Sequence, residues 1–114
     1  MKKVYNLLGI AQRAGKLSAG TMAAKNSLTR RRAVLLILSN DIAANSKEEL
    51  LASSNRHGIP AIAFGSKYDL GTALGKAYRV ALTINDVGIA KAILQELAAS
   101  GEEIKTMGVV EWPK

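Results

Sequence analysis

The sequence contains no cysteine, so it can form no disulfide framework and has no thiolate to act as a nucleophile or a metal ligand. His57 is the single histidine, which is poor support for a metal site. Its place beside Gly58, where we expect a helix to end, favours capping of helix carbonyls. The longest apolar run, Ala33 to Leu38, is far too short to span a bilayer. We therefore expect no metal, no cofactor and no membrane partner, and a cytoplasmic protein.

Acidic side chains are absent from the first forty residues, and the first side-chain carboxylate in the chain is that of Asp41. The remaining residues hold eight basic and nine acidic groups, so the net charge of +7 comes from the N-terminal third. Such segregated charge in a small domain is typical of a protein that binds a polyanion. The alternative is surface charge that serves only solubility. The basic residues of this third are Lys2, Lys3, Arg13, Lys16, Lys25, Arg30, Arg31 and Arg32.

Patterns that would indicate catalysis are also missing. There is no Gly-x-Ser-x-Gly motif, and the acidic pairs Glu48-Glu49 and Glu102-Glu103 are adjacent, so the two carboxylates of a pair do not point the same way on a helix. The segment Gly71 to Lys76 fails as a phosphate-binding loop, because it has three residues between its glycines and no hydroxyl after its lysine. We expect a protein that is not an enzyme and has no small-molecule substrate. A small nucleotide-binding α/β domain remains the last alternative.

Strands and helices alternate along the chain, which predicts an α/β fold with helices on both faces of a sheet. Three buried strands are expected at 33–38, 59–64 and 79–84. Helices are expected at about 4–14, at 21–31, from a Ser46–Glu49 capping box to Gly58, from a Ser66–Asp69 capping box to Gly75, and from Asn85-Asp86 to Gly101. The length suits one domain covering residues 1–114, with residues 102–114 left unassigned.

The stretch from Gly15 to Lys25 is the first candidate for a binding site. A helix that begins near Gly20 or Thr21 has unpaired N–H groups and a positive dipole end there, and Gly20 lets a partner approach closely. Lys25 follows one turn after Thr21 on the same face. These donors suit phosphate oxygens or the acceptor edge of guanine. The plainer interpretation is an ordinary capped helix with a solvated lysine.

The loop Lys76-Ala77-Tyr78-Arg79 is the second candidate. A cation, a small residue, an aromatic ring and a second cation can hold a nucleic-acid backbone and cover an unstacked base. An ordinary helix-to-strand connection with an exposed tyrosine is the alternative.

Four segments of the sequence, in this order, carry a resemblance to a known family: Asn6 to Leu17, Gly20 to Lys25, Gly65-Ser66-Lys67 and Leu70 to Lys76. The sequence resembles the kink-turn RNA-binding ribosomal-protein superfamily, and especially its bacterial YlxQ-like branch. The similarity covers roughly residues 3–98. It implies a three-layer α/β/α sandwich with a central mixed sheet of about four strands. It also implies a non-catalytic protein that binds kink-turn-like structured RNA on the ribosome or in another RNP. The alternative is a general basic RNA or ribosome-surface binder without kink-turn specificity.

Site residues follow from the resemblance. In the family, the N-terminus of the second helix enters the groove of a sharply bent RNA at tandem sheared G·A pairs. Gly20, Thr21, Met22 and Lys25 fall at these positions, although the family has a polar or acidic residue where Met22 stands. The remaining residues that the resemblance implies are Asn40, Lys67, Lys76, Ala77, Tyr78 and Arg79. Lys16 is expected to contact RNA as a cation that adds non-specific affinity.

Overall fold

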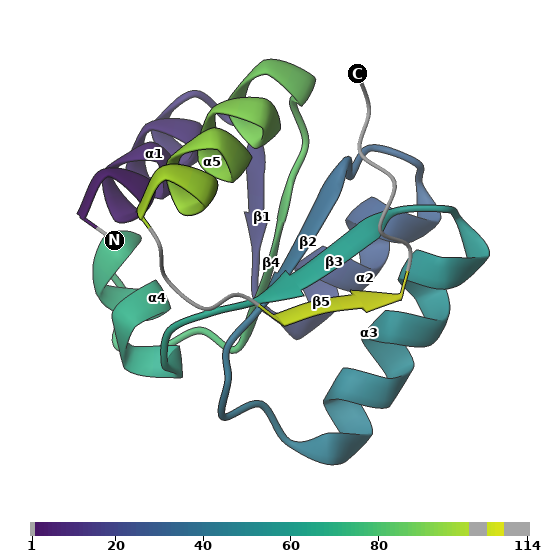
Figure 1. Ribbon diagram of the computed structural model, residues 1–114. Helices are drawn as coiled ribbons and strands as arrows, with labels where there is room; N and C mark the ends of the chain where they lie inside the picture. The colour runs from purple at the N-terminus through teal and green to yellow at the C-terminus, as the bar shows by residue number, and fades with distance from the viewer. Residues whose placement is uncertain (1, 101–104, 109–114) are drawn as a thin grey trace.

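The computed structural model describes residues 2–100 and 105–108 (Figure 1). Its helices are α1 (Lys2–Arg13), α2 (Thr21–Thr29), α3 (Ala44–Arg56), α4 (Lys67–Ala73) and α5 (Val87–Ser100). Its strands are β1 (Leu17–Ala19), β2 (Leu35–Leu38), β3 (Pro60–Ala63), β4 (Ala81–Ile84) and β5 (Lys105–Gly108). Of the helices in this described part of the chain, none combines the length and the apolar character needed to cross a bilayer.

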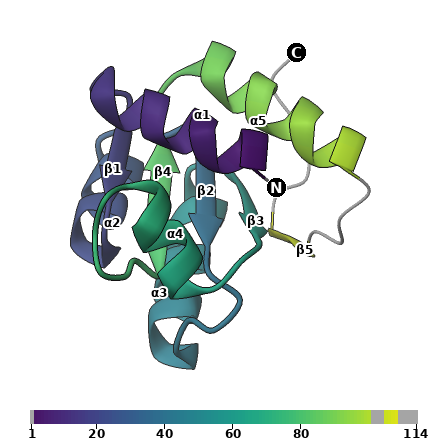
Figure 2. The same cartoon turned by 90° about the vertical axis from the view of Figure 1, so that its left-hand side faces the viewer.

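The five strands form one mixed sheet in the order β1-β4-β2-β3-β5. β2 and β3 are parallel, and β4 runs antiparallel to both of its neighbours, β1 and β2. Helices α1, α4 and α5 cover one face of the sheet, and α2 and α3 cover the other (Figures 1 and 2). This arrangement confirms the predicted three-layer sandwich.

The buried strand β2 shows why two layers of helices are needed. Leu35 and Ile37 belong to the core under α1, α4 and α5, whereas Leu36 and Leu38 belong to the core under α2 and α3. All four side chains are completely buried. Successive residues of a strand point to opposite faces, so a continuous apolar run requires cover on both sides.

The structure has two strands that were not predicted and one helix that starts earlier than predicted. The sheet has five strands rather than about four, because the three residues of β1 pair with β4 and residues 105–108 of the unassigned tail pair with β3. The Ser46–Glu49 capping box was wrong: α3 begins earlier, after Ala43, and no side chain caps it. The Ser66–Asp69 box at the start of α4 is confirmed. Residues 102–104 and 109–114 of the tail lie outside the described residues, and the division into domains stays a prediction.

Candidate nucleic-acid interface

One edge of the sheet gathers segments that are distant in the sequence. β1, β2 and β3 end at this edge and β4 begins there, because β4 is antiparallel to β1 and β2 while β3 is parallel to β2. We call this edge the rim and define it by residues 20–22, 39–41, 65–68 and 76–80. Both candidate segments, at Gly20 and at Lys76, therefore lie on the same side of the molecule.

Main-chain hydrogen bonds tie the rim segments to one another. They join Gly20 N–H to Ala81 O at 2.9 Å, Ser39 N–H to Val80 O at 2.9 Å, Asn40 N–H to Gly65 O at 2.8 Å and Arg79 N–H to Lys67 O at 2.9 Å. Each bond links two connections that come from different strands. The rim is therefore one continuous surface whose parts hold each other in place.

The N-terminus of α2 presents open space on this surface. Gly20 is the N-cap residue and has φ 104°, a conformation that an L side chain rarely adopts. A Cβ atom built on Gly20 has no neighbour within 4 Å, so no atom of residues 2–100 and 105–108 fills the space above it. Thr21 is half-buried, and Met22 is 72% exposed. The first N–H groups of α2 thus face solvent beside an exposed apolar side chain.

A polar cluster fixes α2 on the sheet. Asn85 accepts hydrogen bonds from the Ser27 hydroxyl at 2.8 Å and the Thr83 hydroxyl at 3.0 Å, and its amide donates to Ser18 at 3.0 Å. The cluster joins α2 to β1 and β4 at the end opposite the rim. It compensates for the few large apolar side chains that α2 buries, of which Leu28 is the main one.

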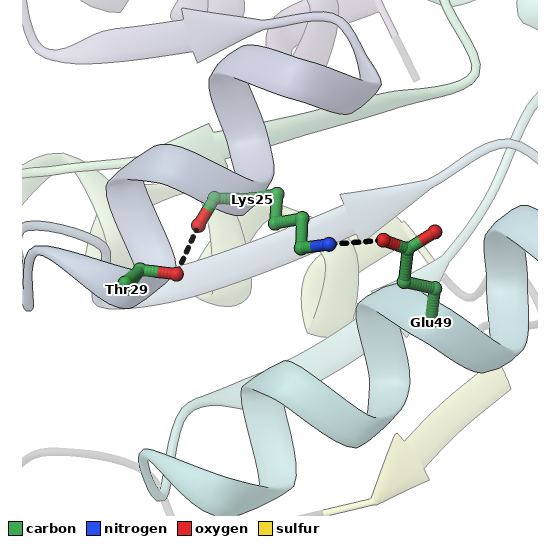
Figure 3. Close-up of polar contacts among 3 residues, drawn as sticks. All are labelled: Lys25, Thr29 and Glu49. Atoms are coloured by element: carbon green, nitrogen blue, oxygen red, sulfur yellow. Dashed lines mark hydrogen bonds and ion pairs between the residues drawn. The ribbon is translucent and has the colours of Figure 1, made fainter.

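Lys25 does not point freely toward solvent. Its ammonium group forms an ion pair with Glu49 of α3, which also accepts its hydrogen bond (Figure 3). The two side chains are 45% and 54% exposed, so water screens this pair. The pair lies 24 residues apart in sequence and depends on the packing of α2 against α3.

The loop before β4 is held against α4. A Cβ atom added to Gly71 would lie 2.5 Å from the Tyr78 Cα and 2.7 Å from its nitrogen, so only glycine allows this approach. Lys76, Ala77 and Tyr78 are exposed, and the Arg79 guanidinium donates to the Tyr78 carbonyl at 2.6 Å.

Lys67 lies between two exposed tyrosines. Its ammonium nitrogen is 5.3 Å from the centre of the Tyr68 ring and 5.6 Å from that of Tyr78, and the two tyrosine residues are 60% and 54% exposed. Both distances are within the range of a cation–π contact. Tyr68 was not among the site residues predicted from the sequence, although its position next to Lys67 at the capped start of α4 is a signal that could have indicated it.

Asp41 closes the rim between β2 and α4. Its carboxylate accepts a hydrogen bond from the Lys67 N–H at 3.0 Å. The pKa of the Asp41 carboxyl is lowered, mainly by the adjacent Ser39 hydroxyl and further by the Lys67 N–H. The buried Ser39 hydroxyl is near this carboxylate but falls short of a formed hydrogen bond. Asn40, which is exposed, stands beside this junction.

Lys16 is the predicted site residue that the structure does not bring to the rim. It precedes β1, and its carbonyl accepts a hydrogen bond from the Asn85 N–H at 2.8 Å, where β4 ends. That places Lys16 at the opposite edge of the sheet. The other predicted residues lie on the rim, except Lys25, which lies one helical turn behind it.

Comparison with known proteins identifies relatives of this chain. It is 29% identical over 93 residues to the "RNA-binding protein YlxQ" of Bacillus subtilis (strain 168), covering 82% of this chain and 93% of the relative. It is 30% identical over 90 residues to the "RNA-binding protein YlxQ" of Enterococcus faecium, covering 79% and 86% respectively. These relatives are named as RNA-binding proteins rather than enzymes, which agrees with the predicted absence of catalysis.

Solved structures share the fold. A protein of unknown function from Bacillus halodurans C superposes with a TM-score of 0.79 at 30% identity, covering 84% of this chain and 97% of that one. The Giardia lamblia 15.5kD RNA binding protein superposes with a TM-score of 0.69 at 22% identity, covering 83% and 84%. The model of the ribosomal protein L7Ae/L30e/S12e/Gadd45 family matches residues 2–94. The chain therefore belongs to this family.

Proposed function

We propose that the chain is a non-catalytic RNA-binding protein whose rim recognises a sharply bent, kink-turn-like RNA. The observation that carries the proposal is the junction of the α2 N-terminus with the loop before β4, through the bond from Gly20 N–H to the Ala81 carbonyl. The names of the YlxQ relatives support RNA as the ligand. We further place this RNA in the ribosome or another cytoplasmic RNP.

The N-terminus of α2 would enter the groove of the RNA at its tandem G·A pairs. Its free N–H groups and the open space over Gly20 allow phosphate oxygens or guanine acceptors to approach the main chain. The Thr21 hydroxyl adds a further donor or acceptor. Lys25 would break its ion pair with Glu49 to contact the RNA. This step costs little free energy, because an exposed ion pair stabilises a protein by only about 0.2–1 kcal/mol.

The second half of the rim would hold the bend. Lys67, Lys76 and Arg79 offer positive charge to phosphates that the bend brings together. The exposed ring of Tyr78 offers a face for an unstacked base, and base–aromatic stacking is worth about 1–3 kcal/mol. Since a surface of this shape fits only the bent RNA, binding shifts the conformational equilibrium toward that form.

A mobility-shift titration tests this function. It compares a kink-turn RNA with a version whose G·A pairs are disrupted, at one fixed salt concentration. We expect the native chain to prefer the kink-turn RNA and Lys25→Ala to lose much of that preference. Lys2→Ala removes the same charge from α1 and should keep the preference. Full retention by Lys25→Ala would contradict the helix-entry model.

A general basic RNA binder is the second candidate. Met22 favours it, because this exposed apolar side chain stands at the helix start where a polar group would read a base edge. Equal affinity for the kinked and the disrupted RNA would support this candidate.

A further inference from the structure

The rim leaves most of the segregated positive charge unexplained. Of the eight basic residues in the acid-free first third of the chain, only Lys25 lies next to the rim, and Glu49 pairs with it. Around the rim, the cations Lys67, Lys76 and Arg79 are offset by Asp41 and Asp69. The strongest electrostatic signal in the sequence therefore belongs to another part of the surface.

That surface is the opposite edge of the sheet. The connections that precede β1, β2 and β3 all lie there, because these strands end at the rim. We call this edge the far edge and define it by Lys16, Arg30, Arg31, Arg32, Arg56 and His57. Helix α2 separates it from the rim by about 14 Å, the length of nine helical residues at 1.5 Å each.

The two helix ends at the far edge enclose a hollow. Arg31, Arg56, His57 and Ile59 line a depression of about 300 Å³ where α2 and α3 end. Within residues 2–100 and 105–108, the side chains of Arg30, Arg31, Arg32 and Arg56 form no hydrogen bond or ion pair. Asp86 at the end of β4 is engaged as a helix cap, accepting from the Ile89 N–H at 2.9 Å.

Arg31 adopts a conformation that suits glycine. Its φ is 59°, and it is the one non-glycine residue with positive φ in the described part of the chain. Its N–H donates to the Leu28 carbonyl at 3.1 Å, and the Arg32 N–H donates to the Ser27 carbonyl at 2.9 Å, which together form a Schellman motif. An arginine here is conformationally costly, so helix termination alone does not account for it.

Helix dipoles do not account for the cations either. The C-termini of α2 and α3 each carry about −0.5 of an elementary charge. Counting the described residues alone, Lys16 and the four arginines outweigh these two ends and Asp86, which leaves a net positive charge of about three.

We propose that the far edge is a second polyanion-binding surface, which takes the phosphate backbone of an RNA segment other than the one on the rim. Its arginines can hold phosphate oxygens with two N–H groups each, and the hollow between Arg31 and Arg56 admits a phosphate. The protein would then join two RNA segments across the sheet. This inference depends on the proposed function only for the choice of RNA as the polyanion.

Binding of a plain RNA duplex across a salt series tests the far edge, with the native chain and the double variant Arg31→Gln/Arg56→Gln. We expect the variant to bind about 10- to 30-fold more weakly, and the magnitude of the slope of log K against log salt to fall by about 1.8, or about 0.9 for each of the two charges removed. Lys2→Gln/Lys3→Gln removes the same charge from α1 and serves as the control.

The Arg31→Gly variant distinguishes a role of Arg31 in RNA binding from a role in folding. It removes the guanidinium and relieves the positive φ, so we expect the melting temperature to rise by about 4 °C while duplex affinity falls. An arginine needed only for folding would instead lower the melting temperature on replacement and leave the affinity unchanged.

A rim variant, Lys67→Gln/Lys76→Gln, distinguishes failure of this proposal from failure of kink-turn recognition. It should weaken binding of the kink-turn RNA, while the effect of the far-edge variant on duplex binding persists. If Arg31→Gln/Arg56→Gln matched the Lys2→Gln/Lys3→Gln control in affinity and salt slope, the far edge would not bind RNA. An acidic protein surface would then be the partner class to test.

Discussion

Replacing Glu49 with glutamine should strengthen RNA binding. Glu49 holds the ammonium group of Lys25, which the proposed function assigns to the RNA (Figure 3). Glutamine keeps the length of the side chain and removes its charge. Lys25 would then be free before the RNA arrives, and a carboxylate would no longer lie near the incoming phosphates.

The magnitude follows from the exposure of the pair. Because the two side chains are 45% and 54% exposed, the ion pair contributes about 0.2–1 kcal/mol to the stability of the free protein. The native chain loses this free energy when Lys25 turns to the RNA, whereas the Glu49→Gln variant has no such ion pair to lose. Repulsion between Glu49 and a phosphate about 10 Å away adds about 0.4 kcal/mol in water. Together these terms amount to about 0.6–1.4 kcal/mol, or about a 3- to 10-fold gain in affinity. Folding stability should fall by less than about 1 kcal/mol.

Fluorescence anisotropy with a kink-turn RNA at fixed salt measures this gain. Glu48→Gln is the matched control, since it removes a neighbouring charge that makes no ion pair with Lys25. In a Lys25→Ala background, the gain from Glu49→Gln should shrink to the effect of the control, because the pair is already broken. An equal gain from both glutamine variants, or an undiminished gain without Lys25, would refute the reasoning.

Three further predictions follow from the rim. Gly71→Ala should displace the Tyr78 main chain, lowering stability by about 1–3 kcal/mol and weakening RNA binding, whereas Thr72→Ala on the same helix should do neither in thermal melts and titrations. Asp41→Asn should destabilise the chain at neutral pH, because a carboxyl whose folded pKa is lowered contributes stability above its unfolded pKa of about 4. The difference in stability between Asp41→Asn and the native chain should vanish as pH falls through the folded pKa, and a difference that does not change with pH would exclude the Asp41 charge as its cause. Met22→Gln should raise the preference for kink-turn RNA over its G·A-disrupted form by supplying a base-edge donor, and an unchanged ratio would exclude contact at this position.

Local signals predicted the elements that lie closest to the candidate site. The start of α2 at Thr21 and the capping box at Ser66 follow from residue types within a few positions, and the structure has both. Strand β1 escaped prediction because three residues between two glycines show no period, and its pairing with β4 defines it. The Ser46 box failed because helix α3 starts earlier, at a residue whose side chain gives no capping signal.

Side-chain partners at the rim could not be predicted from the sequence for a different reason. The ion pair of Lys25 with Glu49 needs α2 and α3 to pack on the same face of the sheet. The placement of Lys67 between Tyr68 and Tyr78 needs the close approach of α4 and the loop before β4. Both contacts depend on tertiary geometry, about which local propensities carry no information.

The direction of β4 decides which residues share a surface. β1, β2 and β3 all run in the same direction, so the loop before each of them lies at the far edge and the loop after each of them lies at the rim. Were β4 parallel to its neighbours, the loop at 76–80 would lie with Lys16 at the far edge, and the α2 N-terminus would lack its partner. Because β4 is antiparallel, its start is bonded to Gly20 and to the end of β2. A change that shifts the start of β4 should therefore alter both halves of the proposed RNA site together.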